Sequence, residues 1–140
     1  SDRQLQSTVR HAIRGKYIVI TGSGAGRRIE LTKKGKKINQ KMALESVRPH
    51  RAKVWDKKWR VVLFDIPESS RKSRNSFAVG LKRMGFMQIQ KSCFAFPYPC
   101  FEEAEVLADF CEVRAHVKLI LAEQMDGGQG LFSRFKIKEK

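Results

Sequence analysis

The first residue that could carry chemistry is an aspartate at the end of an apolar stretch. Asp65 lies near the end of WRVVLFDIP, residues 59–67, two residues before Pro67. Apolar side chains alternate onto both faces of this stretch, which predicts a central strand covered on both sides. The strand must end near the proline, which cannot donate to the ladder. A carboxylate in this position suits a catalytic or metal site, and it equally suits a cap on the turn into the next helix. Residue type alone leaves both roles open.

Two arginines follow Asp65 in the next predicted helix. Apolar residues recur there at helical spacing, and the helix is expected to begin at Ser69 or Ser70 and to end near residue 85. Arg71 and Arg74 stand in its first turns. Cationic groups in this position could pair with Asp65 or bind phosphate.

Most of the positive charge lies in the first part of the chain. The net charge is +15, and residues 1–60 hold 17 Lys or Arg against 4 Asp or Glu, or +13. Residues 61–140 hold 12 against 10, or +2. This asymmetry indicates a polyanion partner, and double-stranded DNA is favoured because the segment is neither low in complexity nor without periodicity. A membrane surface is disfavoured because the basic residues do not line a strongly apolar helical face.

Residues 2–14 are predicted to form a helix with one polar face. Leu5, Val9 and Ile13 recur at the spacing of an apolar helical stripe, Asp2 can cap the start and Gly15 can end the helix. The polar face can reach phosphates and base edges, although an ordinary solvated face has the same composition. Its candidate DNA contacts are Arg3, Gln6, Ser7, Arg10 and Arg14.

A β-hairpin is predicted after this helix. Residues 16–20 and 27–32 read as strands around the glycine-rich turn TGSGAG, residues 21–26. A phosphate-binding loop would need a helix directly after the glycines, whereas a strand follows here. The hairpin therefore carries Arg27 and Arg28 at its tip, and a second helix capped by Thr32 begins with Lys33 and Lys34. These four basic residues complete the predicted DNA surface.

The order of helix, basic hairpin and LTxxGxxI over residues 2–42 resembles the second half of a winged-helix DNA-binding domain. In that family the helix enters the major groove and the hairpin contacts the flanking backbone or the minor groove. The two preceding helices of the family are not found, so the chain resembles a fragment of such a domain. The predicted domains are a partial winged helix over residues 1–45, a basic linker over residues 46–58 and a second domain over residues 59–140.

The second domain is predicted to be ferredoxin-like. A bent strand or two short ones over residues 87–99, a helix over 102–113 and a strand over 115–122 complete a βαββαβ order, so the fold class is α+β. A last strand over residues 131–137 would expose an unpaired edge, which predicts a homodimer. Three cysteines without paired spacing and the lack of a long apolar run favour a cytoplasmic protein with no membrane partner.

The order of WRVVLFDIPE, RKSRNSFAVGLKRMGF and QIQKSCFAF resembles the middle domain of the PaaX family of bacterial transcriptional repressors. That domain is similar to Cas2, a small dimeric CRISPR-associated nuclease. The resemblance implies operator binding as a dimer. In the nuclease the strand-end aspartate, here Asp65, is the proposed metal ligand, and Arg71, Arg74, Arg83 and Phe94 fall at or near positions implicated in cleavage. Phe64 and Ala95 depart from the nuclease pattern, which has a tyrosine and often an acidic residue there.

Two functional hypotheses follow. The first is a DNA-binding transcriptional regulator, a PaaX-like repressor that is not an enzyme and needs no cofactor. The second is a metal-dependent endonuclease or CRISPR adaptation subunit of the Cas2 type, with magnesium or manganese at Asp65. The resemblance implies release of DNA with an aryl-CoA ligand and a third, C-terminal domain. Nothing after Ile137 could supply such a domain, so a small-molecule effector is not supported in this chain.

Overall fold

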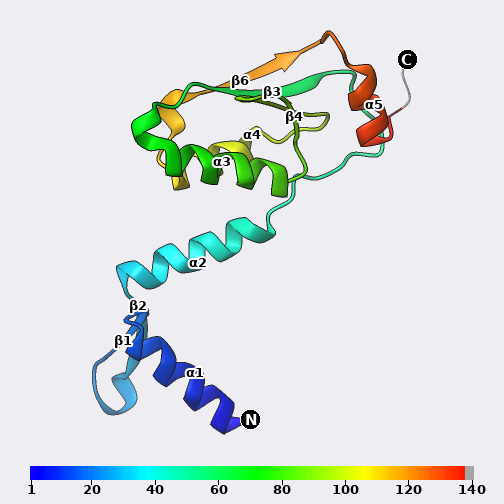
Figure 1. The fold of residues 1–140 in the computed structure, drawn as a ribbon. Coiled ribbons are helices and arrows are strands. Elements are labelled where there is room, and N and C mark those ends of the chain that lie inside the picture. The colour runs from blue at the N-terminus through cyan, green and yellow to red at the C-terminus, as the bar shows by residue number, and fades with distance from the viewer. Residues whose placement is uncertain (138–140) are drawn as a thin grey trace. The chain divides into compact units, whose positions relative to one another are not determined.

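A computed structural model of the chain describes residues 1–137 and shows two compact units (Figure 1). The first unit comprises residues 1–44, and the second begins at Glu45. In the first unit, helix α1 spans Asp2–Arg14 and is followed by strands β1, Ile18–Thr21, and β2, Arg28–Leu31. The strands pair antiparallel with a short 3₁₀ turn, Gly24–Gly26, between them. The predicted helix and hairpin are confirmed.

Helix α2, Lys33–Ser46, follows the hairpin directly and is fixed to it at its first turn. Thr32 caps the helix as predicted, since its hydroxyl accepts from the Gly35 amide at 3.0 Å and donates to the Lys16 carbonyl at 2.6 Å. A Cβ on Gly35 would lie 1.9 Å from the Tyr17 carbonyl oxygen. The close approach of helix to hairpin therefore requires glycine at this position.

The second unit is built on a four-stranded antiparallel sheet. Its strands are β3, Trp59–Phe64, β4, Met87–Gln90, β5, Cys93–Phe96, and β6, Val117–Ala122. They lie in the order β4-β5-β3-β6, with β3 paired to β5 on one side and to β6 on the other. Helices α3, Arg71–Arg83, and α4, Phe101–Phe110, lie on the same side of the sheet (Figure 1). This is the ferredoxin-like βαββαβ arrangement, so the predicted α+β fold is confirmed.

The core lies between the sheet and these two helices. Phe64 of β3 packs edge-on against Phe77 of α3 at 5.2 Å between ring centroids, and it stacks on Phe94 of β5 at 5.9 Å. The two helices approach closely where a Cβ on Gly80 would lie 2.7 Å from a methyl group of Leu107. Large apolar side chains at alternate strand positions thus hold β3 at the centre of the unit.

The predicted last strand is wrong. Residues 129–135 form helix α5, Gln129–Phe135, near the start of β3 (Figure 1). Leu131 and Phe135 fit an alternating strand pattern, but they also stand four apart on one helical face, and both are buried. Phe132 lies at 5.6 Å from Trp59 between ring centroids. The spacing of these residues fits both a strand and a helix, and packing against the core decides that the segment is a helix. The argument that an exposed last strand favours a homodimer therefore no longer applies.

The segment predicted as a linker, residues 46–58, is part of the second compact unit. Val47, Ala52 and Trp55 pack against the core. The indole nitrogen of Trp55 donates to the Lys58 carbonyl at 2.9 Å. The segment was predicted to be a linker because of its basic composition, and the apolar residues that pack against the core were not recognised.

Candidate nucleic-acid interface

The predicted polar face of α1 is exposed over its whole length. Ser1 caps the helix, because its hydroxyl accepts from the Gln4 amide at 3.4 Å, whereas Asp2 was predicted to do so. The helix ends before Gly15 as predicted, and it buries none of its residues. The five candidate DNA contacts of this face are all exposed, namely Arg3, Gln6, Ser7, Arg10 and Arg14.

The hairpin presents the two arginines Arg27 and Arg28 at a tight, glycine-rich tip. Gly22 has a φ of 78°, and a Cβ there would lie 2.4 Å from the Gly26 carbonyl oxygen. The Arg27 amide closes the 3₁₀ turn by donating to the Gly24 carbonyl at 3.2 Å. Both arginine side chains are exposed. The backbone of the turn, and not side-chain packing, therefore places these two residues at the tip.

The two predicted lysines at the start of α2 differ in their surroundings. Lys33 is exposed. The Lys34 ammonium donates to the Gly15 carbonyl at 3.0 Å and lies 4.6 Å from the centroid of the Tyr17 ring. Lys34 thus helps to hold α2 to the end of α1, a role that sequence reasoning did not anticipate.

Unpaired positive charge is concentrated in the first unit. Residues 1–44 hold 11 Lys or Arg against 2 Asp or Glu, or +9, and the remaining residues hold 18 against 12, or +6. Across residues 1–137, the ion pairs of the structure all lie in the second unit. The first unit therefore presents its charge without internal neutralisation.

The alternative site at Asp65 is assembled differently from the prediction. Asp65 is exposed after β3, where its amide donates to the His116 carbonyl at 3.0 Å. Arg71 and Arg74 both bind Glu68 instead, the latter at 3.0 Å between Nη1 and Oε2. These hydrogen bonds from Arg71 and Arg74 hold the pKa of Glu68 below its usual range. Of the two roles left open for these arginines, pairing with Asp65 or phosphate binding, the first is not the one seen, because a carboxylate nearer in sequence engages both.

The structure does not gather the other nuclease-type residues around Asp65. Phe94 is fully buried in the core. Arg83 is exposed at the far end of α3 from Arg71, about 18 Å along a helix axis. Within residues 1–137 no group of three or more His, Cys, Asp or Glu side chains could hold a metal ion. A hard divalent cation takes several oxygen ligands, so the donors of one described chain do not fit magnesium or manganese at Asp65.

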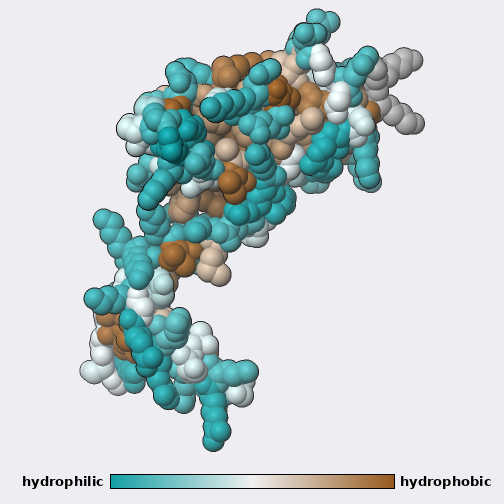
Figure 2. All heavy atoms as spheres, viewed as in Figure 1, coloured by the Kyte–Doolittle hydropathy of each residue, from teal (hydrophilic) through white to brown (hydrophobic). Residues whose placement is uncertain are grey.

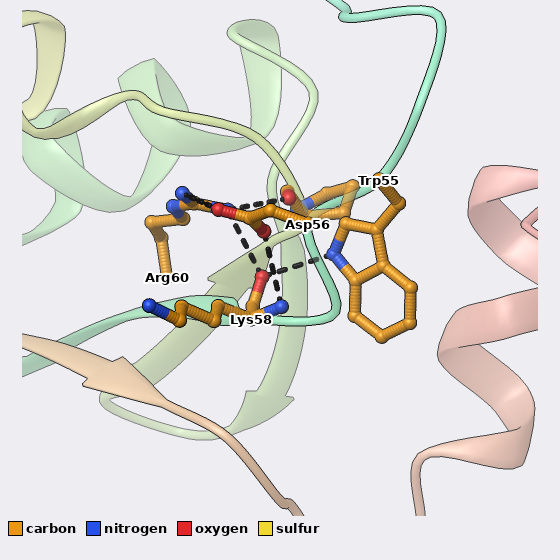
Figure 3. A network of polar contacts seen from close by, with 5 residues as sticks. Trp55, Asp56, Lys58 and Arg60 are labelled. Atoms are coloured by element: carbon orange, nitrogen blue, oxygen red, sulfur yellow. Dashed lines mark hydrogen bonds and ion pairs between the residues drawn. The ribbon is translucent and has the colours of Figure 1, made fainter. Parts of the chain in front are cut away.

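Sequence reasoning missed an ionic network around a buried arginine that fixes β3. Arg60 is 7% exposed inside the strand, and its Nη2 lies 2.6 Å from Oδ2 of Asp56 (Figure 3). Its Nη1 donates to the Pro97 carbonyl at 2.8 Å, which ties β3 to the end of β5. The hydrogen bond from Arg60 lowers the pKa of Asp56. The available signal was a single basic residue within an otherwise apolar strand.

Comparison with known families agrees with this architecture. A family model described as the PaaX protein central Cas2-like domain matches residues 52–130, more than half of the chain. The chain belongs to the PaaX family. At the family level it is a PaaX-like regulator. None of the curated proteins compared with it matches the chain.

The PaaX match covers the sheet and helices α3 and α4, and it begins before β3 at Ala52. The basic first unit lies outside the matched residues, so its role rests on its own chemistry. Among the described residues of this PaaX-family chain, no helix has the length and apolar character needed to cross a membrane.

Proposed function

We propose that this PaaX-family chain is a DNA-binding transcriptional repressor whose first unit contacts duplex DNA. The observation that carries the proposal is the excess of +9 over residues 1–44, presented on exposed side chains outside the ion pairs of the described residues. Cations that neutralise phosphates release condensed counterions, which drives binding to DNA. No comparable driving force exists for a neutral partner.

The two basic elements of the first unit suit different parts of the duplex. Helix α1 offers Arg3, Gln6 and Arg10 on an exposed face, and arginine and glutamine form bidentate hydrogen bonds with guanine and adenine edges in the major groove. Arg27 and Arg28 stand on a turn fixed by its backbone, which suits contacts to phosphate oxygens. The helix would specify sequence and the hairpin would position the protein.

We further propose that the second unit forms a homodimer through the open face of its sheet. This face is opposite α3 and α4. It bears Leu63 and Ile120, whose side chains are 42% and 40% exposed. Leu63 pairs with Cys93 of β5 and with Lys118 of β6, so these two residues lie on the same face. Figure 2 shows hydrophobic side chains at the surface over β6. A second copy buries the same residues in a two-fold interface, and each Å² of apolar surface removed from water contributes roughly 25 cal/mol.

The DNA contact is tested by replacing Arg27 and Arg28 with alanine in the full chain. The affinity for duplex DNA is measured by fluorescence anisotropy over a range of salt concentrations. If both arginines touch phosphate, the slope of log affinity against log salt falls by about 2, at roughly 0.9 per contact. The control replaces Lys72 and Lys82, exposed lysines of α3, with alanine and removes the same charge. A native slope in the arginine variant would remove the hairpin from the DNA interface.

The dimer is tested by sedimentation velocity at tens of micromolar protein. Ile120→Asp places a charge on the open face and should convert a dimer to a monomer. Leu121→Asp is the matched control, since Leu121 pairs with Arg60 and lies on the opposite face of the same strand. A native chain that sediments as a monomer contradicts the proposed dimer.

A further inference from the structure

We propose that the second unit carries a second contact surface for duplex DNA at its α5 end, which binds the phosphate backbone without reading sequence. Five basic side chains form this surface, here called the α5 cluster. Its members are Arg51, Lys53, Lys57, Arg134 and Lys136. The inference rests on the proposed function, because it assigns a further surface to the same partner.

Two segments far apart in sequence bring these side chains together. Lys53, Lys57 and Lys136 line one cleft of about 420 Å³ whose walls include Trp55 and Tyr98. The lysines come from the segment before β3 and from the residue after α5. The fold thus places three ammonium groups around a single concave surface.

The two arginines of the cluster meet at one aromatic ring. The guanidinium carbon of Arg51 lies 5.8 Å from the centroid of Phe135, and that of Arg134 lies 5.6 Å from the same centroid. Phe135 directly precedes Lys136 of the cleft. Both arginines therefore lie over the same aromatic ring, which stands next to the lysine cleft in the sequence.

The cluster has no internal counterion in the described part of the chain. Asp56 is the only acidic residue of residues 51–57, and Arg60 engages its carboxylate at 2.6 Å. Among the residues that the structure describes, the lining of this cleft contains no acidic side chain. None of the ion pairs formed within residues 1–137 involves a member of the cluster. Like charges closer than a Debye length, about 8 Å at physiological salt, repel, and a bound polyanion relieves that repulsion.

The backbone under the lysines is held in place. Trp55 packs on Trp59 at 4.8 Å and on Phe132 at 5.4 Å between ring centroids. Lys57 and Lys136 adopt left-handed backbone conformations, with φ of 66° and 55°. Such conformations are uncommon for residues other than glycine and persist only where the surroundings impose them. The charges therefore project from a fixed framework.

The character of the surface favours the DNA backbone over its bases. The indole of Trp55 is packed in the aromatic group and its N–H is bonded to the Lys58 carbonyl, so the ring is not free to stack on a base. The cluster draws cations from two segments, which suits a polyanion with regularly spaced phosphates. The same DNA is the proposed partner of the first unit. Contacts to phosphate alone carry no sequence information.

The test uses the full chain with three substitutions, Lys53→Gln, Lys57→Asn and Lys136→Asn. Asparagine is chosen for the last two because it tolerates the left-handed conformation. Affinity for two duplexes of unrelated sequence is measured against salt. The slope should fall by roughly 0.9 per lysine that touches phosphate, or about 2 to 3, equally on both duplexes. The control replaces the exposed residues Lys72, Lys82 and Lys91 with Gln, and its slope should stay near the native one.

Several outcomes overturn the inference. Equal slopes in the cluster variant and the native chain exclude a phosphate contact there, and equal losses in both variants attribute the effect to net charge. A cluster variant that loses pyrophosphate binding in calorimetry while keeping its DNA slope assigns the cleft to a small anion instead. Thermal unfolding followed by circular dichroism verifies that each variant is folded.

The experiment also separates this inference from the proposed function. If Arg27→Ala with Arg28→Ala lowers the slope and the cluster variant does not, only the second surface is rejected. If the native chain binds neither duplex, the proposed function itself fails.

Discussion

The two units of this PaaX-family chain differ in how much of their surface is buried and in how much excess charge they carry. In the first unit, residues 1–44, only Gly35 and Leu44 are buried, and the excess charge is +9. In the second unit, Val62, Phe77 and Phe94 are fully buried, and each ion pair of the described residues lies there. The first unit is shaped by backbone contacts that display cations, and the second by a core that holds a sheet. The second unit therefore holds most of the buried core, and the first unit has the higher density of excess charge.

The largest expected effect is a core truncation in the second unit. Phe94→Ala leaves a cavity among Phe64, Val62 and the helices, and it should lower the free energy of unfolding by about 3–5 kcal/mol. Leu5→Ala in α1 should change it by less than about 0.5 kcal/mol, since Leu5 is 64% exposed. Chemical denaturation followed by circular dichroism measures both. Comparable losses in the two variants would show that the first unit has a core of its own.

The next effect concerns the contact that shapes the first unit. Gly35→Ala forces a Cβ to within 1.9 Å of the Tyr17 carbonyl oxygen, so α2 must move away from the hairpin. We expect a loss of about 1–3 kcal/mol, confined to residues 1–44. Hydrogen exchange of backbone amides locates the loss, and faster exchange of the Thr32 amide, which donates to Tyr17, should be its clearest sign. The control is Gly26→Ala, where a Cβ meets no atom within 4 Å. Unchanged protection of Thr32 would contradict the expectation.

A smaller effect is predicted for the ion pair that anchors β3. Asp56→Asn removes the charge of the carboxylate that pairs with the buried Arg60, and we expect a loss of about 1–2 kcal/mol at pH 7 because Asp56 is half exposed. The hydrogen bond from Arg60 lowers the pKa of Asp56 below its ordinary 3.8. The ionised form is therefore favoured by folding, and its contribution is complete above the unfolded pKa and lost as pH falls through the lower folded pKa.

The pH dependence supplies the readout for that ion pair. The difference in unfolding free energy between the native chain and Asp56→Asn should be constant from pH 7 to about 5 and should shrink below about pH 4. Asp109→Asn, at an exposed aspartate outside the ion pairs of the described residues, should show no such difference. A native-minus-variant difference that does not change with pH would reject the coupling to Arg60.

The units also differ in how far the sequence predicts them. The sheet of the second unit could be predicted from the alternation of apolar residues in its strands and from the order of its motifs. Both signals are present in the local sequence. Helix α5 was missed because Leu131 and Phe135 satisfy both periods, and only contacts with residues such as Trp59 decide between them. The partner of Arg60 was missed because a left-handed turn at Lys57 precedes it, and a single sequence does not reveal that turn.

The candidate DNA surface was predictable in outline for a related reason. Arg27 and Arg28 follow from the hairpin and its glycines, which are local features. The bond from Lys34 to the Gly15 carbonyl joins residues 19 apart, and the α5 cluster joins residues more than 70 apart. The local sequence pattern predicts on which helix or strand a side chain lies. Which side chains come together in space depends on how the helices and strands pack.

The smallest expected effect is that of a substitution at Asp65. This substitution distinguishes the regulator hypothesis for the second unit from the nuclease hypothesis. The side chain is exposed, and Arg71 and Arg74 are engaged by Glu68. Its backbone amide donates to the His116 carbonyl, and that bond survives substitution. Asp65→Asn should therefore change the free energy of unfolding by less than about 0.5 kcal/mol and leave DNA affinity unaltered.

The same variant tests for cleavage. The native chain and Asp65→Asn are incubated with labelled single- and double-stranded RNA and DNA in magnesium or manganese. We expect no hydrolysis by either protein, since one carboxylate per chain supplies too few oxygen ligands for a hard divalent ion and Phe64 before it has no hydroxyl to contribute. Two Asp65 side chains brought together by a dimer could share such an ion. Hydrolysis by the native chain that Asp65→Asn abolishes would establish that arrangement and make the second unit an enzyme.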